Sequence, residues 1–264
     1  MIESNNKLIL GYDLESWNIF GIKKELGVDI SPKTNSHILL SGMSGSGKSY
    51  MEFGLVAKLI LAEKDYGGEY YFADFKADDM FECLRGTPRY RSFKQTTELL
   101  DIVYDRLNDR MSGKDKTRHP ITLIWDEYMA NILSLMSENK ANATKVMNKV
   151  SEILLMGRSK SVRLICSCQR PDMVAFPVGS RLNYGIVIIL GVGKSIYEML
   201  MPDHLDQIKN KAFNRGEGAV LLQSSELHFI KIGQVNDIES MKKICIEALS
   251  KPIRDGEAKR EPSK

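Results

Sequence analysis

Long apolar runs are missing from this sequence of 264 residues, and so is a strong excess of charge of either sign. No stretch of about eighteen or more apolar residues occurs, so no membrane-spanning helix is evident. The first residues, MIESNNKLIL, lack the basic and apolar segments of a secretion signal. We therefore expect a cytoplasmic protein without a membrane segment of its own. The 37 basic and 34 acidic residues give a net charge of +3, which neither demands nor excludes a polyanionic partner.

Cysteine is also scarce, and its spacing argues against a zinc site or a disulfide framework. The four cysteines are Cys83, Cys166, Cys168 and Cys245, and no two of them form a CxxC pair. Cys166 and Cys168 lie two residues apart in an apolar run, so both side chains should point to one face of a strand. We expect buried, reduced thiols.

What the sequence does contain is a 43% hydrophobic fraction arranged in short runs of strand length. The runs are Ile38 to Ser41, Tyr70 to Ala73, Ile121 to Trp125, Arg163 to Cys168 and Tyr184 to Leu190. They are almost continuously apolar, as in strands that are covered on both faces. Helical stripes lie between them, at Leu99, Leu100, Val103, Tyr104, Leu107 and Met111 and at Val146, Val150, Ile153 and Leu154. This alternation predicts an α/β fold with a mostly parallel sheet flanked by helices.

Two segments stand outside the alternating pattern. Residues 1–35 contain several glycines and predict a small β lead-in packed on a core that spans residues 36–250. Gly218 to Val235 predicts a C-terminal hairpin that turns at Ser224 and Ser225, followed by a helix from Ile238 to Ser250. The charged residues 251–264 contain two prolines, and we expect them to form a disordered tail.

The run GMSGSGKS, from Gly42 to Ser49, fits the P-loop pattern G-x-x-x-x-G-K-[ST]. Glycines allow backbone N–H groups to surround a phosphate, and the following helix adds its dipole. Lys48 should reach the β- and γ-phosphates of ATP, and the Ser49 hydroxyl should bind Mg²⁺. The alternative is a Gly/Ser linker, which would require neither the preceding apolar strand nor the following helix. The expected ATP-binding residues are Gly42, Met43, Ser44, Gly45, Ser46, Gly47, Lys48, Ser49 and Tyr50.

A second motif, with two acidic residues, follows a later apolar strand in HPITLIWDEYM. Asp126 has the position of a Walker B carboxylate beside Mg²⁺, and Glu127 can polarise an attacking water. The second acid favours ATP hydrolysis over nucleotide sensing. The alternative is an exposed acidic pair that caps the next helix.

Two further stretches bear on the site. In SVRLICSCQRPD, Gln169 follows an apolar strand and could contact the γ-phosphate or the water, although a turn cap is the plainer interpretation. Gly191 to Ser195 looks like a second P-loop, but the first required glycine is replaced by Ile188. We therefore expect one nucleotide site in the chain.

In their order, these motifs resemble the FtsK/HerA superfamily of DNA-pumping ATPases, and most closely the FtsK/SpoIIIE motor domain. The blocks that carry the resemblance are HILLSGMSGSGKS, YFADFKADD with Asp74 and Lys76, ELLDIVYDRLNDRM, LIWDEY, MGRSKSVRLICSCQRP and RGEGAVLL. The resemblance covers the chain from about Leu8 to Val235. Agreement of several blocks in order is more specific than any single motif.

The resemblance implies a RecA-like P-loop core that acts as a hexameric ring around double-stranded DNA. It makes Lys48, Glu127 and Gln169 catalytic, with Gln169 as the glutamine of a motif that reads SCQRP here. It also implies an arginine supplied by the neighbouring subunit, but this chain has Gly185 and the Gly193–Ile196 run where the family has its arginines. Arg158, Arg181 and Arg215 are the candidates, in that order, against the alternative that they are ordinary surface arginines.

The function implied is an ATP-driven pump for double-stranded DNA, acting in conjugation, mobile-element transfer or DNA packaging. A coupling or adaptor protein on a DNA-processing or secretion complex remains open, as does a P-loop kinase, which Glu127 disfavours. A relaxase or a membrane channel would be a further partner. Three basic groups are candidates for the DNA channel: Lys114, Lys116 and Arg118; Arg85, Arg89, Arg91 and Lys94; and Lys145, Lys149, Arg158 and Lys160.

Overall fold

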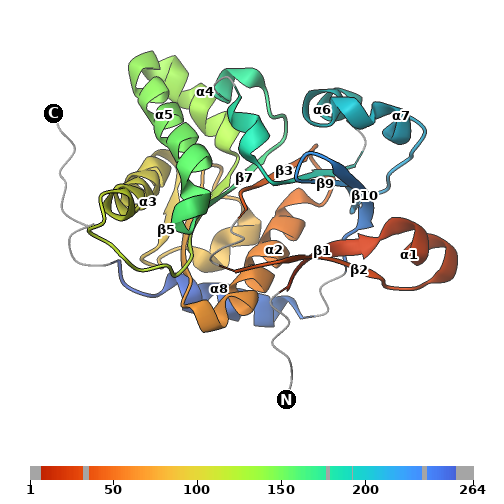
Figure 1. Cartoon of the computed structure of the whole chain (residues 1–264), viewed down its shortest axis with the longest axis horizontal. Coiled ribbons are helices and arrows are strands. Elements are labelled where there is room, and N and C mark those ends of the chain that lie inside the picture. Colours follow the sequence, from red (N-terminus) through yellow and green to blue (C-terminus); the bar gives the residue numbers. More distant parts are fainter. Residues whose placement is uncertain (1–6, 32–35, 177–178, 192, 234–236, 254–264) are drawn as a thin grey trace.

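The computed structural model describes residues 7–31, 36–176, 179–191, 193–233 and 237–253 (Figure 1). In chain order the strands are β1 (Lys7–Asp13), β2 (Glu25–Asp29), β3 (Ile38–Gly42), β4 (Glu69–Asp74), β5 (Tyr90–Ser92), β6 (Ile121–Asp126), β7 (Val162–Cys168), β8 (Ile186–Leu190), β9 (Glu217–Leu222) and β10 (Glu226–Lys231). The α-helices are α1 (Leu14–Phe20), α2 (Lys48–Ala62), α3 (Thr96–Met111), α4 (Tyr128–Glu138), α5 (Lys140–Met156), α6 (Lys194–Leu200), α7 (Leu205–Ile208) and α8 (Ile238–Leu249).

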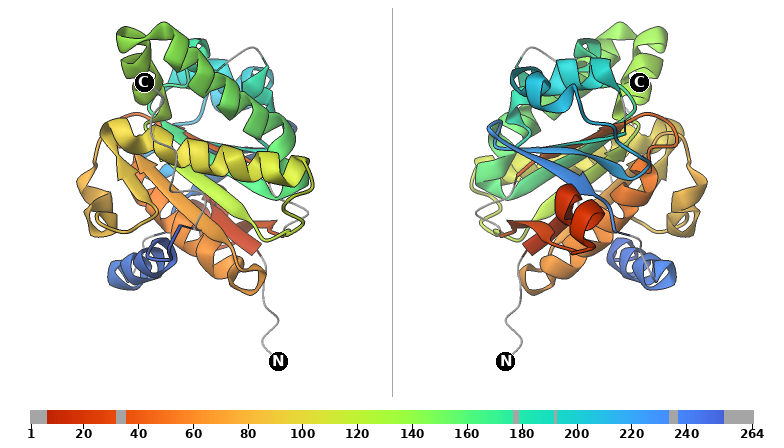
Figure 2. Two further views of the ribbon diagram at one scale, coloured as in Figure 1. Left: turned by 90° about the vertical axis from the view of Figure 1, so that its left-hand side faces the viewer. Right: turned by 90° about the vertical axis from the view of Figure 1, so that its right-hand side faces the viewer.

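One ten-stranded sheet runs through the molecule in the order β2-β1-β10-β9-β8-β3-β7-β6-β4-β5. The six strands from β8 to β5 are parallel, and β9, β10, β1 and β2 extend the sheet in antiparallel pairs. Helices α3, α4, α5 and α6 cover one face, and α2 and α8 cover the other (Figures 1 and 2). The predicted fold class, a mostly parallel sheet flanked by helices, is confirmed.

The central strands are buried on both faces because both helical layers pack on them. Every residue of β3, β4, β6, β7 and β8 is buried, which accounts for their nearly continuous apolar sequences. In β7, Cys166 and Cys168 face the α5 side together, whereas Ile165 faces the α2 side. The four cysteines are free, and Cys166, Cys168 and Cys245 are buried.

The lead-in joins the sheet through β1, which pairs with β10 and with β2. The predicted hairpin is formed by β9 and β10, and the backbone turns at Gln223 and Ser224, both with positive φ. Val235 lies outside the described residues. So do residues 254–264 of the predicted tail, whereas the backbone oxygen of Pro252 accepts a hydrogen bond from Arg89 at 2.9 Å.

The helical stripe predicted for α3 is right for most of its members and wrong at its end. Leu99, Leu100, Val103 and Leu107 are buried, but Met111 is 45% exposed. Arg106 and Arg110 are buried instead, because acidic and backbone partners from distant segments satisfy their guanidinium groups. None of the helices in the described part of the chain is long and apolar enough to cross a membrane.

Candidate nucleotide-binding site

The predicted nucleotide-site residues meet at the carboxyl edge of the parallel strands. β3 runs into the P-loop, and β7 and β6 are the next strands on one side of it. Because parallel strands all end at the same edge, the residues that follow β3, β6 and β7 lie close together. Lys48 begins α2, and Asp126 ends β6. Lys48 and Asp126 are 78 residues apart in sequence, and their side chains form a direct hydrogen bond.

The P-loop needs glycine at three positions. Gly45 and Gly47 have φ angles of 81° and 99°, in the left-handed region that favours glycine. At Gly42, an added Cβ atom would lie 2.6 Å from the Ser46 hydroxyl oxygen. This tight path ends at the N-terminus of α2, where free backbone N–H groups and the helix dipole favour an anion.

Lys48 is held by the acidic motif. Its Nζ atom lies 2.8 Å from Asp126 Oδ1, 3.1 Å from Glu127 Oε1 and 3.2 Å from Ser167 Oγ. The Ser167 hydroxyl donates to Asp126 Oδ1 at 2.5 Å. Burial alone would lower the pKa of Lys48, but the surrounding carboxyl groups raise it above its ordinary value, so the lysine is protonated.

Glu52 is a further carboxyl group of this cluster, which the sequence motifs did not point to. It lies one helical turn after Lys48 on α2 and is fully buried, and neither of its carboxyl oxygens has a hydrogen-bond donor. Burial raises the pKa of Glu52 well above its usual value, and the nearby Asp126 raises it further. The spacing of four residues from Lys48 is the sequence signal that could have identified it.

The loop after β4 adds two more contacts. The Ser49 hydroxyl donates to Asp78 Oδ2 at 3.2 Å, and Lys76 Nζ lies 3.3 Å from Glu127 Oε2. Lys76 was part of the motif YFADFKADD, but the contact of Asp78 with Ser49 was not expected from the sequence. Strand β4 is the neighbour of β6, which is why this loop reaches the Walker B pair.

Asp74 ends β4 and is buried. Its Oδ2 accepts a hydrogen bond from the Tyr90 hydroxyl at 2.8 Å, and its Oδ1 accepts one from the backbone N–H of Asp78 at 3.2 Å. Burial raises the pKa of Asp74 to about 6, although these hydrogen bonds act in the opposite direction.

The donor set fits a magnesium ion. Ser49 contributes a hydroxyl and Asp126 a carboxylate, and Asp78 lies within hydrogen-bond distance of Ser49. Mg²⁺ prefers oxygen ligands and is usually held by one or two carboxylates together with substrate phosphates and water. Ser49 and Asp126 would therefore hold it.

The two ends of the β9–β10 hairpin lie next to the P-loop. The Gly216 N–H donates to the Ser46 backbone oxygen at 2.9 Å, and the Ile232 N–H donates to the Gly216 oxygen at 2.8 Å.

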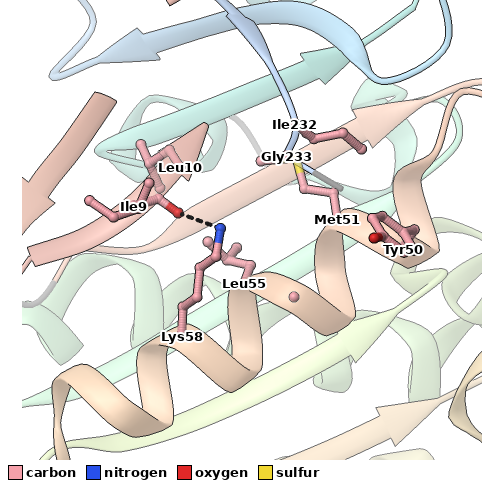
Figure 3. A pocket seen from close by; sticks show the side chains of 9 residues that line it. Ile9, Leu10, Tyr50, Met51, Leu55, Lys58, Ile232 and Gly233 are labelled. Atoms are coloured by element: carbon pink, nitrogen blue, oxygen red, sulfur yellow. Dashed lines mark hydrogen bonds between the residues drawn. The ribbon is translucent and has the colours of Figure 1, made fainter. Parts of the chain in front are cut away.

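Beyond Ser49, a narrow apolar pocket separates α2 from β1 and the end of β10 (Figure 3). It is lined by Ile9, Leu10, Tyr50, Met51, Gly54, Leu55, Lys58, Ile232 and Gly233, and Lys58 Nζ donates to the Ile9 oxygen at 3.5 Å. The lead-in thus supports the P-loop helix from outside.

No family model matches the chain. The FtsK domain-containing protein YdcQ of Bacillus subtilis is 21% identical over 210 residues, which cover 70% of this chain and 42% of YdcQ. ATPases 2 and 3 of EccC from Thermomonospora curvata superpose with a TM-score of 0.68 at 16% identity, covering 95% of this chain and 49% of EccC. The pCW3 conjugation coupling protein TcpA, solved with ATPγS, gives a TM-score of 0.65 at 18% identity, over 93% of this chain and 71% of TcpA.

The chain has the fold of these solved ATPase domains, and in sequence it is similar to an FtsK domain-containing protein. The resemblance expected from the ordered motifs is thereby confirmed, at sequence identities that establish the fold alone. The chain spans less than half the length of YdcQ and of the EccC chain.

Gln169 directly follows β7, is exposed, and its backbone oxygen accepts a hydrogen bond from the Ser41 hydroxyl at 3.3 Å. The residue is therefore at the same edge of the sheet as Lys48 and Glu127. Its contact with a γ-phosphate or a water stays a prediction.

The candidate arginines separate into two groups. Arg158, in the 3-10 helix Gly157–Lys160, precedes β7, and Arg181, in the 3-10 helix Ser180–Asn183, precedes β8. Both arginines therefore come before a parallel strand in the chain, whereas the P-loop comes after one. Arg181 also donates a hydrogen bond to the Pro171 backbone oxygen at 3.2 Å. Arg215 is exposed and directly precedes Gly216, beside its own P-loop.

Two other predictions concern basic residues. Lys194 of the second glycine-lysine run has a 90% exposed side chain that pairs with Glu198 at 3.7 Å. Arg89, a candidate for the DNA channel, is only 4% exposed. Its guanidinium packs over the Tyr71 ring and donates to the Pro252 oxygen, so it is not available to DNA.

Proposed function

We propose that this chain is an ATP-hydrolysing motor domain that works in the cytoplasm, where it moves double-stranded DNA as a hexameric ring.

 The observation that carries the proposal is the meeting of Lys48 with Asp126 and Glu127, at 2.8 and 3.1 Å, at the carboxyl edge of an FtsK/HerA-type sheet. In P-loop NTPases the Walker A lysine holds the β- and γ-phosphates and a Walker B aspartate holds Mg²⁺, and this arrangement supports ATP hydrolysis here.

The contacts of the site suggest how it would work. Lys48 would leave Asp126 and Glu127 for the β- and γ-phosphates, which compete for its positive charge. Glu127 would accept a proton from the attacking water, whose oxygen bonds to the γ-phosphorus as the bond to ADP breaks. Mg²⁺, held by Ser49 and Asp126, would neutralise charge on the phosphates. Gln169 would report loss of the γ-phosphate to the segment that follows β7.

Duplex DNA is the proposed substrate of the movement. We expect purified protein to hydrolyse ATP faster when duplex DNA is added, and this stimulation to weaken as salt rises, because salt competes for phosphate contacts. The measurement is phosphate release across a salt series, with and without DNA. A rate that ignores DNA at every salt concentration would contradict the proposal.

The shared active site can be tested by mixing subunits. Lys48→Ala removes the phosphate-binding lysine, and Arg158→Ala removes the first candidate for the neighbour's arginine. Each variant alone should be inactive, whereas a mixture should regain activity at sites that combine an intact P-loop with an intact Arg158. If the mixture stays inactive while Arg181→Ala shows the recovery, the trans arginine is Arg181. Mass measurement with ATP and DNA checks the ring size.

A second candidate function is a coupling or adaptor protein that uses ATP to assemble on a DNA-processing or secretion complex. Two proteins of similar structure support this second candidate function, because one is a conjugation coupling protein and the other is a Type VII secretion ATPase. A relaxase or a membrane channel would then be the partner. Glu127→Gln separates the two functions: a motor loses DNA movement, whereas an assembly switch keeps its partner while ATP is bound.

A further inference from the structure

The loop after β4, residues 75–78, touches both halves of the nucleotide site. Lys76 Nζ lies 3.3 Å from Glu127 Oε2, and Asp78 Oδ2 accepts the Ser49 hydroxyl at 3.2 Å. One contact reaches the Walker B motif and the other reaches the P-loop. The loop therefore forms a third wall of the site, which neither motif describes.

This loop is fixed by its own contacts. The Phe75 N–H donates to the Asp126 backbone oxygen at 3.4 Å, and the Asp78 N–H donates to Asp74 Oδ1 at 3.2 Å. Arg85 donates to the Ala77 oxygen at 2.8 Å, and Ala77 itself has a φ of 53°. Such a backbone presents Lys76 to Glu127 from a defined position.

The two oxygens of Glu127 are held by different lysines. Oε1 lies 3.1 Å from Lys48, and Oε2 lies 3.3 Å from Lys76. The Glu127 side chain is only 6% exposed, so an ion pair there is poorly screened by water. Lys48 is the lysine that the P-loop motif assigns to the phosphates. Once Lys48 moves to them, Lys76 is the cation that still holds Glu127.

We propose that Lys76 is a positioning residue for hydrolysis: it holds Glu127 through Oε2 and leaves Oε1 free to accept the proton of the attacking water. This inference rests on the proposed ATPase function. Lys76 would act on the reaction through its contact with Glu127. Placing the base correctly matters because small errors in the position of a catalytic group strongly reduce the rate.

If Lys76 only stabilised the fold, its removal would lower the melting temperature. The Lys76 side chain is 43% exposed, and Lys48 still pairs with the buried Glu127 when Lys76 is removed, so the Lys76 pair contributes little to folding stability. Removing Lys76 should therefore leave the melting temperature unchanged. Lys242 provides a matched control, since it forms a comparable pair with Glu239 at 2.8 Å on the surface, with a 34% exposed side chain.

The test compares Lys76→Met, Lys76→Arg and Lys242→Met with the wild type. We expect Lys76→Met to lower kcat for ATP hydrolysis about tenfold or more, with KM and the affinity for ATPγS unchanged. Lys76→Arg should keep most of the activity because it preserves the cation, and Lys242→Met should match the wild type. All variants should melt at the wild-type temperature.

Three results would overturn the inference. They are an unchanged kcat in Lys76→Met, a raised kcat, which would make Lys76 an inhibitory latch, and a loss of ATPγS affinity equal to the loss of rate. A wild-type protein that does not hydrolyse ATP would instead overturn the proposed function on which the inference rests. Measuring the wild type first therefore distinguishes the two failures.

Discussion

Both edges of the sheet bury charge, but they do so in different ways. At the carboxyl edge, Lys48 is surrounded by Asp126, Glu127 and Glu52, and neither oxygen of Glu52 has a hydrogen-bond donor. At the amino edge, all three nitrogens of the Arg110 guanidinium donate hydrogen bonds, to Asp115, to the oxygens of residues 160 and 161 and to the His119 oxygen among others. A bound phosphate would compete with the carboxyl groups for Lys48, whereas the hydrogen bonds of Arg110 are all made within the chain.

The amino edge also contains a fully buried ion pair between Arg163 and Glu63. Their closest atoms are 2.8 Å apart, and both side chains are 0% exposed. The Tyr70 hydroxyl donates to Glu63 Oε2 at 3.0 Å, and Arg163 donates to Thr122 Oγ1 at 3.2 Å. Charge at this edge therefore supports the fold, whereas we propose that charge at the carboxyl edge supports ATP hydrolysis. Substitutions at the two edges should separate these roles.

The largest effect is expected from Lys48→Ala at the carboxyl edge. It removes the cation that would bind the phosphates, so ATP hydrolysis should fall by about 100-fold or more. Phosphate release under saturating ATP measures the loss. Hydrolysis within twofold of the wild type would mean that the P-loop lysine is not part of the working site.

At the amino edge, Arg163→Met should mainly affect stability. Removing one partner of a buried pair leaves Glu63 uncompensated, and we expect the free energy of unfolding to fall by about 3–5 kcal/mol. Denaturant unfolding measures it. The double variant Glu63→Leu, Arg163→Met removes both charges and should recover much of the loss. A single variant as stable as the wild type would show that the pair has no structural role.

The buried Asp74, at the carboxyl end of β4, makes the stability of the fold depend on pH. Its pKa is raised from 3.8 to about 6, so the protonated form favours the folded state. This contribution is present below about pH 4 and is lost as the pH rises through 6; it amounts to ~3 kcal/mol at 1.36 kcal/mol per pKa unit. Asp74→Asn should therefore gain stability relative to the wild type between pH 4 and 7.

The hydrogen bond from Tyr90 lowers the pKa of Asp74, so Tyr90→Phe should move the wild-type decline to higher pH. Unfolding measured across this pH range for the three proteins is the test. Parallel curves for the wild type and Asp74→Asn would exclude Asp74 as the titrating group.

The smallest effect is expected from an exposed ion pair. Lys209 Nζ lies 2.7 Å from Asp206, closer than the atoms of the Arg163 pair, but the two side chains are 60% and 93% exposed. Lys209→Ala should change the free energy of unfolding by less than about 1 kcal/mol. A loss as large as that of Arg163→Met would show that burial does not explain the difference between the edges.

The sequence was informative where the chemistry depends on neighbouring residues. The P-loop and the Asp126–Glu127 pair are local patterns at the ends of apolar strands, so their meeting follows from a parallel sheet. Asp78 could not be assigned in this way, because its role depends on which loop packs against Ser49. The four-residue spacing of Glu52 from Lys48 places both on one side of a helix, but it does not show that this side is buried. The three-residue strand β5 is too short for a periodic signal.

The charged residues of α3 show the same limit. Arg106 and Arg110 look like solvent-facing positions in the sequence, but they are buried because Glu69 and Asp115 approach them from other segments. Met111, which completes the apolar stripe, is left half exposed. A helical pattern identifies the apolar face, but partners that are distant in sequence decide where charged side chains go.

The most direct test of the central claim is displacement of a triplex-forming oligonucleotide from duplex DNA. We expect the wild type to displace the oligonucleotide when ATP and Mg²⁺ are present, and we expect Lys48→Ala and Glu127→Gln to leave it in place. Glu127→Gln should still bind ATP. Displacement by Glu127→Gln at the wild-type rate, or none by a wild type that hydrolyses ATP on duplex DNA, would contradict it.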